Sequence, residues 1–388
     1  MREVYFDYGA ANPLGPEVVE AMIPYLKEQF GNPLSVHRFG DAPRQAVEDA
    51  REKVAALIGA RSNEIYFVAS GSEANNLAVK GIALMNRKRG KHIVVSAIEH
   101  LSVINATQTM EKLGFEVTRV PVDKYGQVDP ADVSTALRED TTLVSIMHAN
   151  SEIGTIQPIA EIAKVVKDES KAYFHTDAVA TVGTIRVDVK ELGVSLLSLA
   201  GNQFYGPKGT GALYIKRATR IMPLIDGGVQ EAGRRAGTEN VPAIVGLGVA
   251  ADLAKGDVQD RMAQLVPLRA RLIERLTKEI DHVYLTGHPT ERLPGHVSVV
   301  VEYIEGEAML LLLNMQGVAA SSGSTCTSRA LKASHVLTAI GIEAGLANGS
   351  LVLTLGREST VEDVDYFAEV FPPIVERLRQ MSPLYEEA

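Results

Sequence analysis

A single cysteine is the most reactive side chain type in this sequence. Cys326 stands in a run of small polar residues, 319–329, that has almost nothing apolar to bury it. Most free cysteines are buried and inert, but a thiol in such a loop is exposed. Positive charge nearby, such as that of Arg329, would favour the thiolate, which is a nucleophile and a soft metal ligand. The context therefore predicts a reactive Cys326, and a structural cysteine is the alternative.

A second candidate site lies between residues 70 and 76, where a strand-like run passes into a helical one. Free backbone N–H groups and the helix dipole at such a start suit a phosphate group. Ser72 would add a hydroxyl. A plain helix cap is the alternative interpretation, because serine is also a good N-cap residue and Ser72 would serve as that cap.

Two polar residues follow other strand-like runs. His100 comes shortly after the run 93–96, and Asp177 follows the run 172–175. A lone histidine or aspartate at a strand end is more often structural than catalytic. Polar groups at the ends of several parallel strands, however, converge on one crevice, which indicates a binding site.

Positive charge occurs at two further places. Arg357 closes a late strand-like run, where a guanidinium can hold a carboxylate with two hydrogen bonds; a surface ion pair is the alternative. The glycine-rich, basic region 227–240 includes Thr238 and could reach a neighbouring subunit.

The elements that position these residues are strands alternating with helices. The expected strands of the first part are 65–69, 93–96, 117–120, 143–148, 172–175, 196–199 and 212–215. Such alternation predicts a mainly parallel sheet covered by helices on both faces.

A long helix over residues 257–280 interrupts this alternation. Strands at 296–301, 317–320 and 350–355 follow, with a final helix at 361–381 that Pro372 and Pro373 should bend or break. We therefore predict a large α/β domain over residues 16–256. Residues 1–15 and 257–388 should form a smaller α+β domain that carries the Cys326 loop.

Composition excludes several partners. The chain has 388 residues and a net charge of −9, which argues against nucleic acid or an anionic membrane as the main partner. No apolar run is long enough to span a bilayer, and no secretion segment stands at the start. One cysteine cannot form an internal disulfide and agrees with a reducing compartment. A cytoplasmic location is expected.

These segments together resemble the cysteine desulfurases, the class V aminotransferase branch of the fold type I enzymes that use pyridoxal 5′-phosphate (PLP). The matching segments occur in the same order along nearly the whole chain: 30–37, 70–76, 99–100, 149–154, 175–178, 205–214, 234–240, 321–328 and 355–357. The resemblance implies the PLP-transferase fold, with a mainly parallel seven-stranded sheet in the large domain.

The resemblance also implies roles for individual residues. In that family, the positions of Gly71 and Ser72 bind the cofactor phosphate, with help from the position of Thr238 in the partner subunit of a homodimer. The position of His100 stacks on the pyridine ring, and that of Asp177 pairs with the ring nitrogen.

Two more roles concern the substrate. The position of Arg357 binds the substrate carboxylate, and that of Cys326 attacks the substrate sulfur to become a persulfide. A mobile loop then carries the sulfur to an acceptor, such as the scaffold protein of iron–sulfur cluster assembly.

One essential position departs from the family. Where its members have Ser-Gly-His-Lys, this chain has Ala200-Gly201-Asn202-Gln203. A carboxamide nitrogen is neither basic nor nucleophilic, so Gln203 cannot form the Schiff base or move the proton at Cα. Ala180 and Ser151 also replace residues near the family's cofactor. Lys208 is an imaginable substitute for the lost lysine.

Three functions follow. The first is a cysteine desulfurase homologue of sulfur transfer or iron–sulfur cluster assembly, with Cys326 as persulfide carrier or cluster ligand and without ordinary PLP-dependent desulfuration. The second is an active desulfurase that converts L-cysteine to L-alanine with non-covalent PLP or another lysine. The third is a non-enzymatic docking partner of a cluster scaffold. The sulfur donor and the acceptor stay open.

Overall fold

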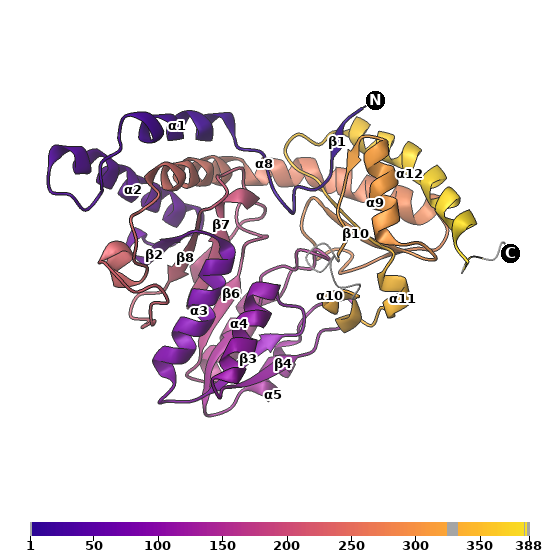
Figure 1. Ribbon diagram of the computed structural model, residues 1–388. Helices are drawn as coiled ribbons and strands as arrows, with labels where there is room; N and C mark the ends of the chain where they lie inside the picture. Colours follow the sequence, from indigo (N-terminus) through magenta and orange to yellow (C-terminus); the bar gives the residue numbers. More distant parts are fainter. Residues whose placement is uncertain (1, 324–332, 384, 386–388) are drawn as a thin grey trace.

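The computed structural model describes residues 2–323, 333–383 and 385 (Figure 1). The strands in these ranges are β1 Val4–Tyr5, β2 Ile65–Val68, β3 His92–Ser96, β4 Glu116–Val120, β5 Thr141–Ser145, β6 Tyr173–Asp177, β7 Leu196–Ala200, β8 Gly211–Ile215, β9 Val283–Leu285, β10 His296–Val301, β11 Val318–Ala319 and β12 Ser350–Thr354. The helices are α1 Pro16–Lys27, α2 Arg38–Leu57, α3 Gly71–Asn86, α4 Leu101–Lys112, α5 Pro130–Ala136, α6 Ile159–Glu169, α7 Val189–Leu192, α8 Val241–Glu279, α9 Gly306–Met315, α10 His335–Ala339, α11 Ala344–Ala347 and α12 Val361–Met381. None of the helices in the described ranges is long and apolar enough to cross a membrane.

The described residues contain a seven-stranded sheet in the order β2-β8-β7-β6-β5-β3-β4. β8 runs antiparallel to both of its neighbours, and the remaining pairs are parallel. Most of these strands are buried along their whole length, as expected for a sheet with helices on both faces. Figure 1 shows α3 and α4 lying across one face of the sheet. The expected mainly parallel α/β fold is thus confirmed.

A second apolar core lies at the other end of the molecule. Its sheet has the order β12-β10-β9, and β1 pairs with β11 beside it. Phe6, Leu272 and Phe371 are among the buried residues of this core. Helix α8 belongs to both cores, because Ala254 packs with the large sheet and Leu265 with the second core. The domain boundaries that the sequence indicates stay a prediction.

The expected start of one helix was wrong, and the possible break in another is absent; a bend of the last helix at its two prolines stays a prediction. Helix α8 begins at Val241, sixteen residues before the expected start at Asp257, with the Asn240 side chain accepting a hydrogen bond from the Ala243 N–H at its first turn. The added turns pack closely on α2 through small residues, which weakens the apolar period in the sequence. Helix α12 continues through Pro372 and Pro373. Buried residues on both sides hold it against the second core, while Pro372 is half-buried and Pro373 is exposed.

A buried carboxyl group connects the ends of two central strands. Oε1 of Glu99 accepts hydrogen bonds from Ser96 Oγ at 2.5 Å and from the Met147 N–H at 2.9 Å. No partner is found for Oε2 among the described residues. Burial raises the pKa of Glu99 from 4.5 to about 8, because the charged form loses its hydration.

This pKa predicts a pH-dependent stability. Between about pH 4.5 and pH 8 the folded protein keeps a proton that the unfolded chain has lost, so the free energy of unfolding falls as the pH rises. Glu99→Gln removes this titration. Relative to the wild type, the variant should therefore gain about 1.4 kcal/mol for each pH unit within that window. Urea denaturation at pH 5, 6, 7 and 8 measures the difference.

The matched control is Glu376→Gln, which changes an exposed carboxyl of α12. The free energy of unfolding of this control should change with pH in the same way as that of the wild type. Parallel behaviour of Glu99→Gln as well would contradict the assignment of a raised pKa to Glu99.

Candidate functional site

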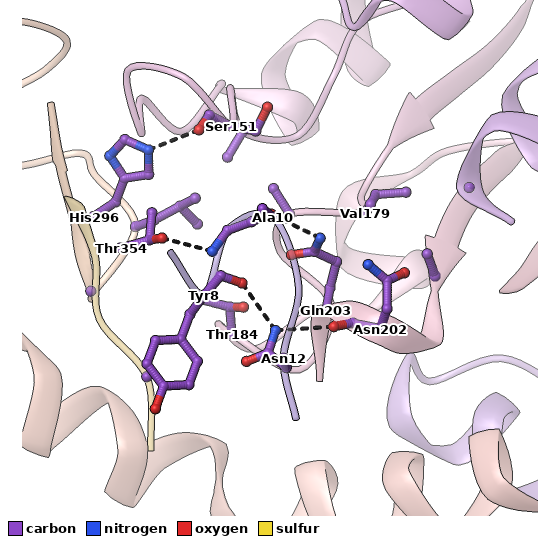
Figure 2. Close-up of a pocket in the computed structure, with 18 of the residues that line it drawn as sticks. Tyr8, Ala10, Asn12, Ser151, Val179, Thr184, Asn202, Gln203, His296 and Thr354 are labelled. Carbon is purple, nitrogen blue, oxygen red and sulfur yellow. Dashed lines mark hydrogen bonds between the residues drawn. The ribbon is translucent and has the colours of Figure 1, made fainter. Parts of the chain in front are cut away.

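A cavity of about 490 Å³ lies where the carboxyl ends of β6 and β7 meet the beginning of α3. The N-terminal segment 8–12, α8 and the end of β12 complete its wall (Figure 2). The cavity brings together five of the predicted site residues: Gly71, Ser72, His100, Asp177 and Gln203. The parallel strands explain this gathering, since their carboxyl ends share one edge of the sheet.

The beginning of α3 is free to receive an anion. Ser70, and not Ser72, is the N-cap: its hydroxyl oxygen accepts a hydrogen bond from the Glu73 N–H at 3.1 Å. The interpretation of Ser72 as the cap was therefore wrong. Ser72 is exposed, and its hydroxyl lies in the first turn of α3. A Cβ at position 71 would come within 2.5 Å of Val179 Cγ2. Only glycine allows this close approach between α3 and the turn that follows β6.

Asp177 is a buried carboxyl at the end of β6. Its Oδ2 accepts a hydrogen bond from Asn75 Nδ2 at 2.6 Å, and its Oδ1 accepts one from the Val179 N–H at 3.0 Å. Burial raises the pKa of Asp177, and the nearby His100 opposes part of that rise. A cationic group in the cavity would stabilise the carboxylate that burial disfavours.

Asn75 links Asp177 to His100. Besides its bond to Asp177, Asn75 Nδ2 donates to Ser102 Oγ at 2.8 Å, and this oxygen lies 2.7 Å from His100 Nδ1. The Ser102 N–H also donates to Nδ1 at 3.1 Å. Nδ1 is therefore an acceptor and a neutral ring carries its proton on Nε2. The hydrogen bonds fix the ring where it lines the cavity.

Gln203 holds the N-terminal segment over the cavity. It ends the short turn Gly201–Gln203, and its Nε2 donates to the carbonyl oxygen of Gly9 at 3.0 Å (Figure 2). The carbonyl oxygen of the preceding Asn202 accepts from both the backbone N–H and the side-chain nitrogen of Asn12, at 3.2 and 3.0 Å. The turn at the expected lysine position thus makes structural contacts to residues almost two hundred positions away.

Lys208 is engaged elsewhere. Its Nζ donates to the carbonyl oxygen of Asn12 at 3.0 Å, and Lys208 is not among the residues that line the cavity. Among the described lining residues there is no lysine at all. An amine that could bond covalently to a ligand is therefore missing from this part of the wall.

Arg357 lies beside the cavity without lining it. Its side chain is 38% exposed and forms an ion pair with Asp257 at 3.7 Å, while its backbone N–H donates to the Tyr205 hydroxyl at 2.6 Å. The cavity wall instead contains Arg261, which is 8% exposed and bonds to both Asp257 oxygens at 2.6 Å. The role of Arg357 in binding a substrate carboxylate stays a prediction.

The two remaining candidates lie away from the described cavity wall. Thr238 is exposed and does not line the cavity of its own chain. Its contribution to the site of a partner subunit stays a prediction. Cys326 lies outside the described residues. In the ranges that are described, no cluster of three or more histidine, cysteine or acidic side chains could hold a metal ion.

The departures from the family pattern gather at the same place. Ala180, Ala200, Asn202 and Ser151 all line the cavity together with Gln203.

The donor set suits PLP bound without a covalent bond. The beginning of α3 with Ser72 could receive the phosphate, the His100 ring could stack, and a protonated ring nitrogen would give Asp177 the cation that it lacks. No lysine stands among the described lining residues.

The sequence interpretation did not single out Asn75, Arg261 or Tyr205. Asn75 stands one helical turn after Gly71, so its place on the same face of α3 could have been read from that spacing. Arg261 and Tyr205 come from distant elements, and no local pattern indicated that they share the cavity.

Comparison with known proteins agrees with the fold. The family model of class-V aminotransferases matches residues 4–367. The chain is 54% identical to "Cysteine desulfurase IscS" of Methanosarcina thermophila over 99% of this chain and 94% of the relative. It is 52% identical to the protein of the same name from Dictyoglomus turgidum, over 100% of this chain and 98% of the relative.

Among solved structures, a "NIFS-LIKE PROTEIN" superimposes with a TM-score of 0.90 at 36% identity, covering 97% of this chain and 99% of that one. A match this extensive in sequence and in structure places the whole described fold within one family. The chain belongs to the class-V aminotransferase family, in its cysteine desulfurase branch.

Proposed function

We propose that this protein carries sulfur in sulfur transfer or iron–sulfur cluster assembly, with Cys326 as the persulfide carrier or as a cluster ligand. The relatives that bear the name cysteine desulfurase support sulfur as the cargo. Ordinary PLP-dependent desulfuration is absent in this proposal, because Gln203 stands at the position of the family's lysine.

The observation that carries the proposal is the cavity wall. It contains Gly71, His100 and Asp177, whose chemistry suits the family's cofactor, but no lysine among its described residues. Gln203 and Lys208 both donate to backbone carbonyls of the N-terminal segment. Neither side chain can take a proton from the α-carbon of an amino acid, since one is not basic and the other lies outside the wall.

The sulfur step needs only the thiolate of Cys326. The thiolate attacks the outer sulfur of a donor persulfide, forms a new S–S bond, and releases the donor as its thiolate. Sulfur is transferred at the oxidation level in which it arrives, so no further oxidant is required. When bound, PLP would supply an electron sink for carbanions next to an amino group; Asp177 and His100 would orient it.

An active desulfurase is the second candidate. The gathering of Ser72, His100 and Asp177 around one cavity favours it, because these residues suit PLP even without a covalent bond. In that case another lysine, or none, would have to move the proton at Cα.

We also propose a homodimer. Val19, Ile23 and Leu26 stand at helical spacing on one side of α1, and each is at least 40% exposed. Exposed apolar side chains continue through Phe30 to Val36. A surface of this kind is covered in most soluble proteins, and a second copy related by a two-fold axis would cover it.

The proposed location is the cytoplasm. One cysteine in 388 residues agrees with a reducing compartment.

The first prediction concerns Cys326→Ser. Incubated with a small persulfide donor, the wild type should gain the mass of one sulfur atom on the peptide that contains Cys326, and the variant should gain none. Anaerobic reconstitution with iron, the donor and a scaffold protein should lose most of its cluster absorbance in the variant. Equal cluster yields from both proteins would favour the docking-partner function instead.

The second prediction restores the lysine. Gln203→Lys should bind PLP covalently and absorb in the visible as an imine. Borohydride should abolish this absorption and leave a pyridoxyl group fixed to residue 203, which peptide mapping detects. The wild type should show no such fixation. Fixation at Lys208 of the wild type would contradict the proposal and support the active desulfurase.

The third prediction tests the dimer. Leu26→Asp places a charge on the exposed side of α1 and should convert the dimer to a monomer in light scattering. Leu311→Asp on α9 is the matched control, since the two leucines are 65% and 68% exposed. It should stay a dimer, and a wild-type monomer would overturn the proposal.

A further inference from the structure

Gln203 presents an unused hydrogen-bond acceptor at the position where the family has its Schiff-base lysine. From this exchange we infer that the cavity prefers the amine form of the cofactor, pyridoxamine 5′-phosphate, over forms without a positive group at C4′. The inference rests on the proposed loss of the lysine at position 203, and it assigns a ligand class to the altered cavity.

The orientation of the Gln203 carboxamide follows from its partner. Gly9 offers a carbonyl oxygen, which can only accept, so the side-chain nitrogen of Gln203 must face it at 3.0 Å. Oε1 is then left for another group. In the part of the chain that the structure describes, no donor is found for Oε1, and Gln203 lines the cavity.

Gly9 is itself held in place, so its carbonyl oxygen keeps the hydrogen bond from the Gln203 side-chain nitrogen. Its own N–H donates to Thr354 Oγ1 at 2.7 Å, so Gly9 is held from both sides. Three residues further on, Asn12 is bound to the Asn202 carbonyl oxygen and to Lys208. The contacts fix the N-terminal segment, and with it the orientation of the Gln203 amide (Figure 2).

The other parts of the cavity complete the recognition of a pyridoxyl phosphate. The strand that precedes the Gln203 turn ends at Ala200, whose Cβ is 3.5 Å from a Cβ placed on Gly71 at the beginning of α3. Asp177 ends the neighbouring strand, where it is paired in register with Ser198 of β7. The groups that would bind the phosphate, the ring and the amine therefore lie at the ends of neighbouring strands and at the beginning of α3.

Charge decides between the forms of the cofactor. The aldehyde oxygen of PLP is an acceptor and would face another acceptor at Gln203 Oε1. The aminomethyl group of pyridoxamine 5′-phosphate carries a positive charge and donates, which gives a charge-assisted hydrogen bond. Arg261 is the only lysine or arginine among the described lining residues, and Asp257 pairs with it. An added ammonium group thus meets little repulsion.

The test compares two ligands that differ only at C4′. Pyridoxamine 5′-phosphate and 4-deoxypyridoxine 5′-phosphate share the ring and the phosphate, but the second has a methyl group in place of the aminomethyl group. Calorimetric titration of the apoprotein should give a Kd about tenfold lower for the amine, as expected for a hydrogen bond to a charged group. Equal dissociation constants would overturn the inference.

Variants assign the preference to Gln203. Gln203→Leu and Gln203→Met should bring the ratio of the two dissociation constants close to one. Both should still bind the deoxy compound, which shows that the cavity remains folded. A tenfold preference that persists in both variants would overturn the assignment, as would a wild type that binds neither compound. Sulfur transfer through Cys326 is measured separately, so its loss or retention tests the proposed function independently of this result.

Discussion

A carboxyl group enclosed at the end of β6 is the constraint on which the cavity depends. An ionised carboxylate away from water is costly unless hydrogen bonds and a countercharge offset the loss of hydration. Asp177 receives hydrogen bonds from Asn75 and from the Val179 N–H, and neither donor carries a charge. A cationic ring nitrogen would complete the environment. The surroundings of Asp177 therefore suit a basic aromatic ligand, and no lysine stands among the described lining residues.

The turn that ends at Gln203 has a structural task. Through Gly9 and Asn12 it holds the chain segment between β1, which pairs within the second core, and α1, which packs on α8. A lysine at position 203 could also donate to the Gly9 carbonyl. The hydrogen bond alone therefore does not explain a glutamine. The feature that a lysine cannot supply is the second atom of the amide, a neutral acceptor beside the donor.

Much of the large sheet could be predicted from the sequence, because buried parallel strands appear as continuous apolar runs between helical segments. His100 and Asp177 were found for the same reason, since each follows such a run. The early start of α8 was missed, because glycine and alanine pack it closely on α2 and leave little apolar periodicity. The contact between Gln203 and Gly9 spans 194 positions, and no local pattern encodes it.

Two reactions make different demands on a protein: removal of the proton from the α-carbon of an amino acid, and transfer of sulfur from a donor to an acceptor. The first needs a base held beside the substrate and a cofactor that stabilises the carbanion. The second needs a thiolate that reaches both donor and acceptor. In the proposed function, Gln203 at the position of the family's lysine removes the first reaction and leaves the second, which depends on Cys326. A ligand that still occupies the cavity would stabilise the folded state by mass action. In the proposed function, such a ligand gives Asp177, Gly71 and His100 a role in stability that does not depend on catalysis.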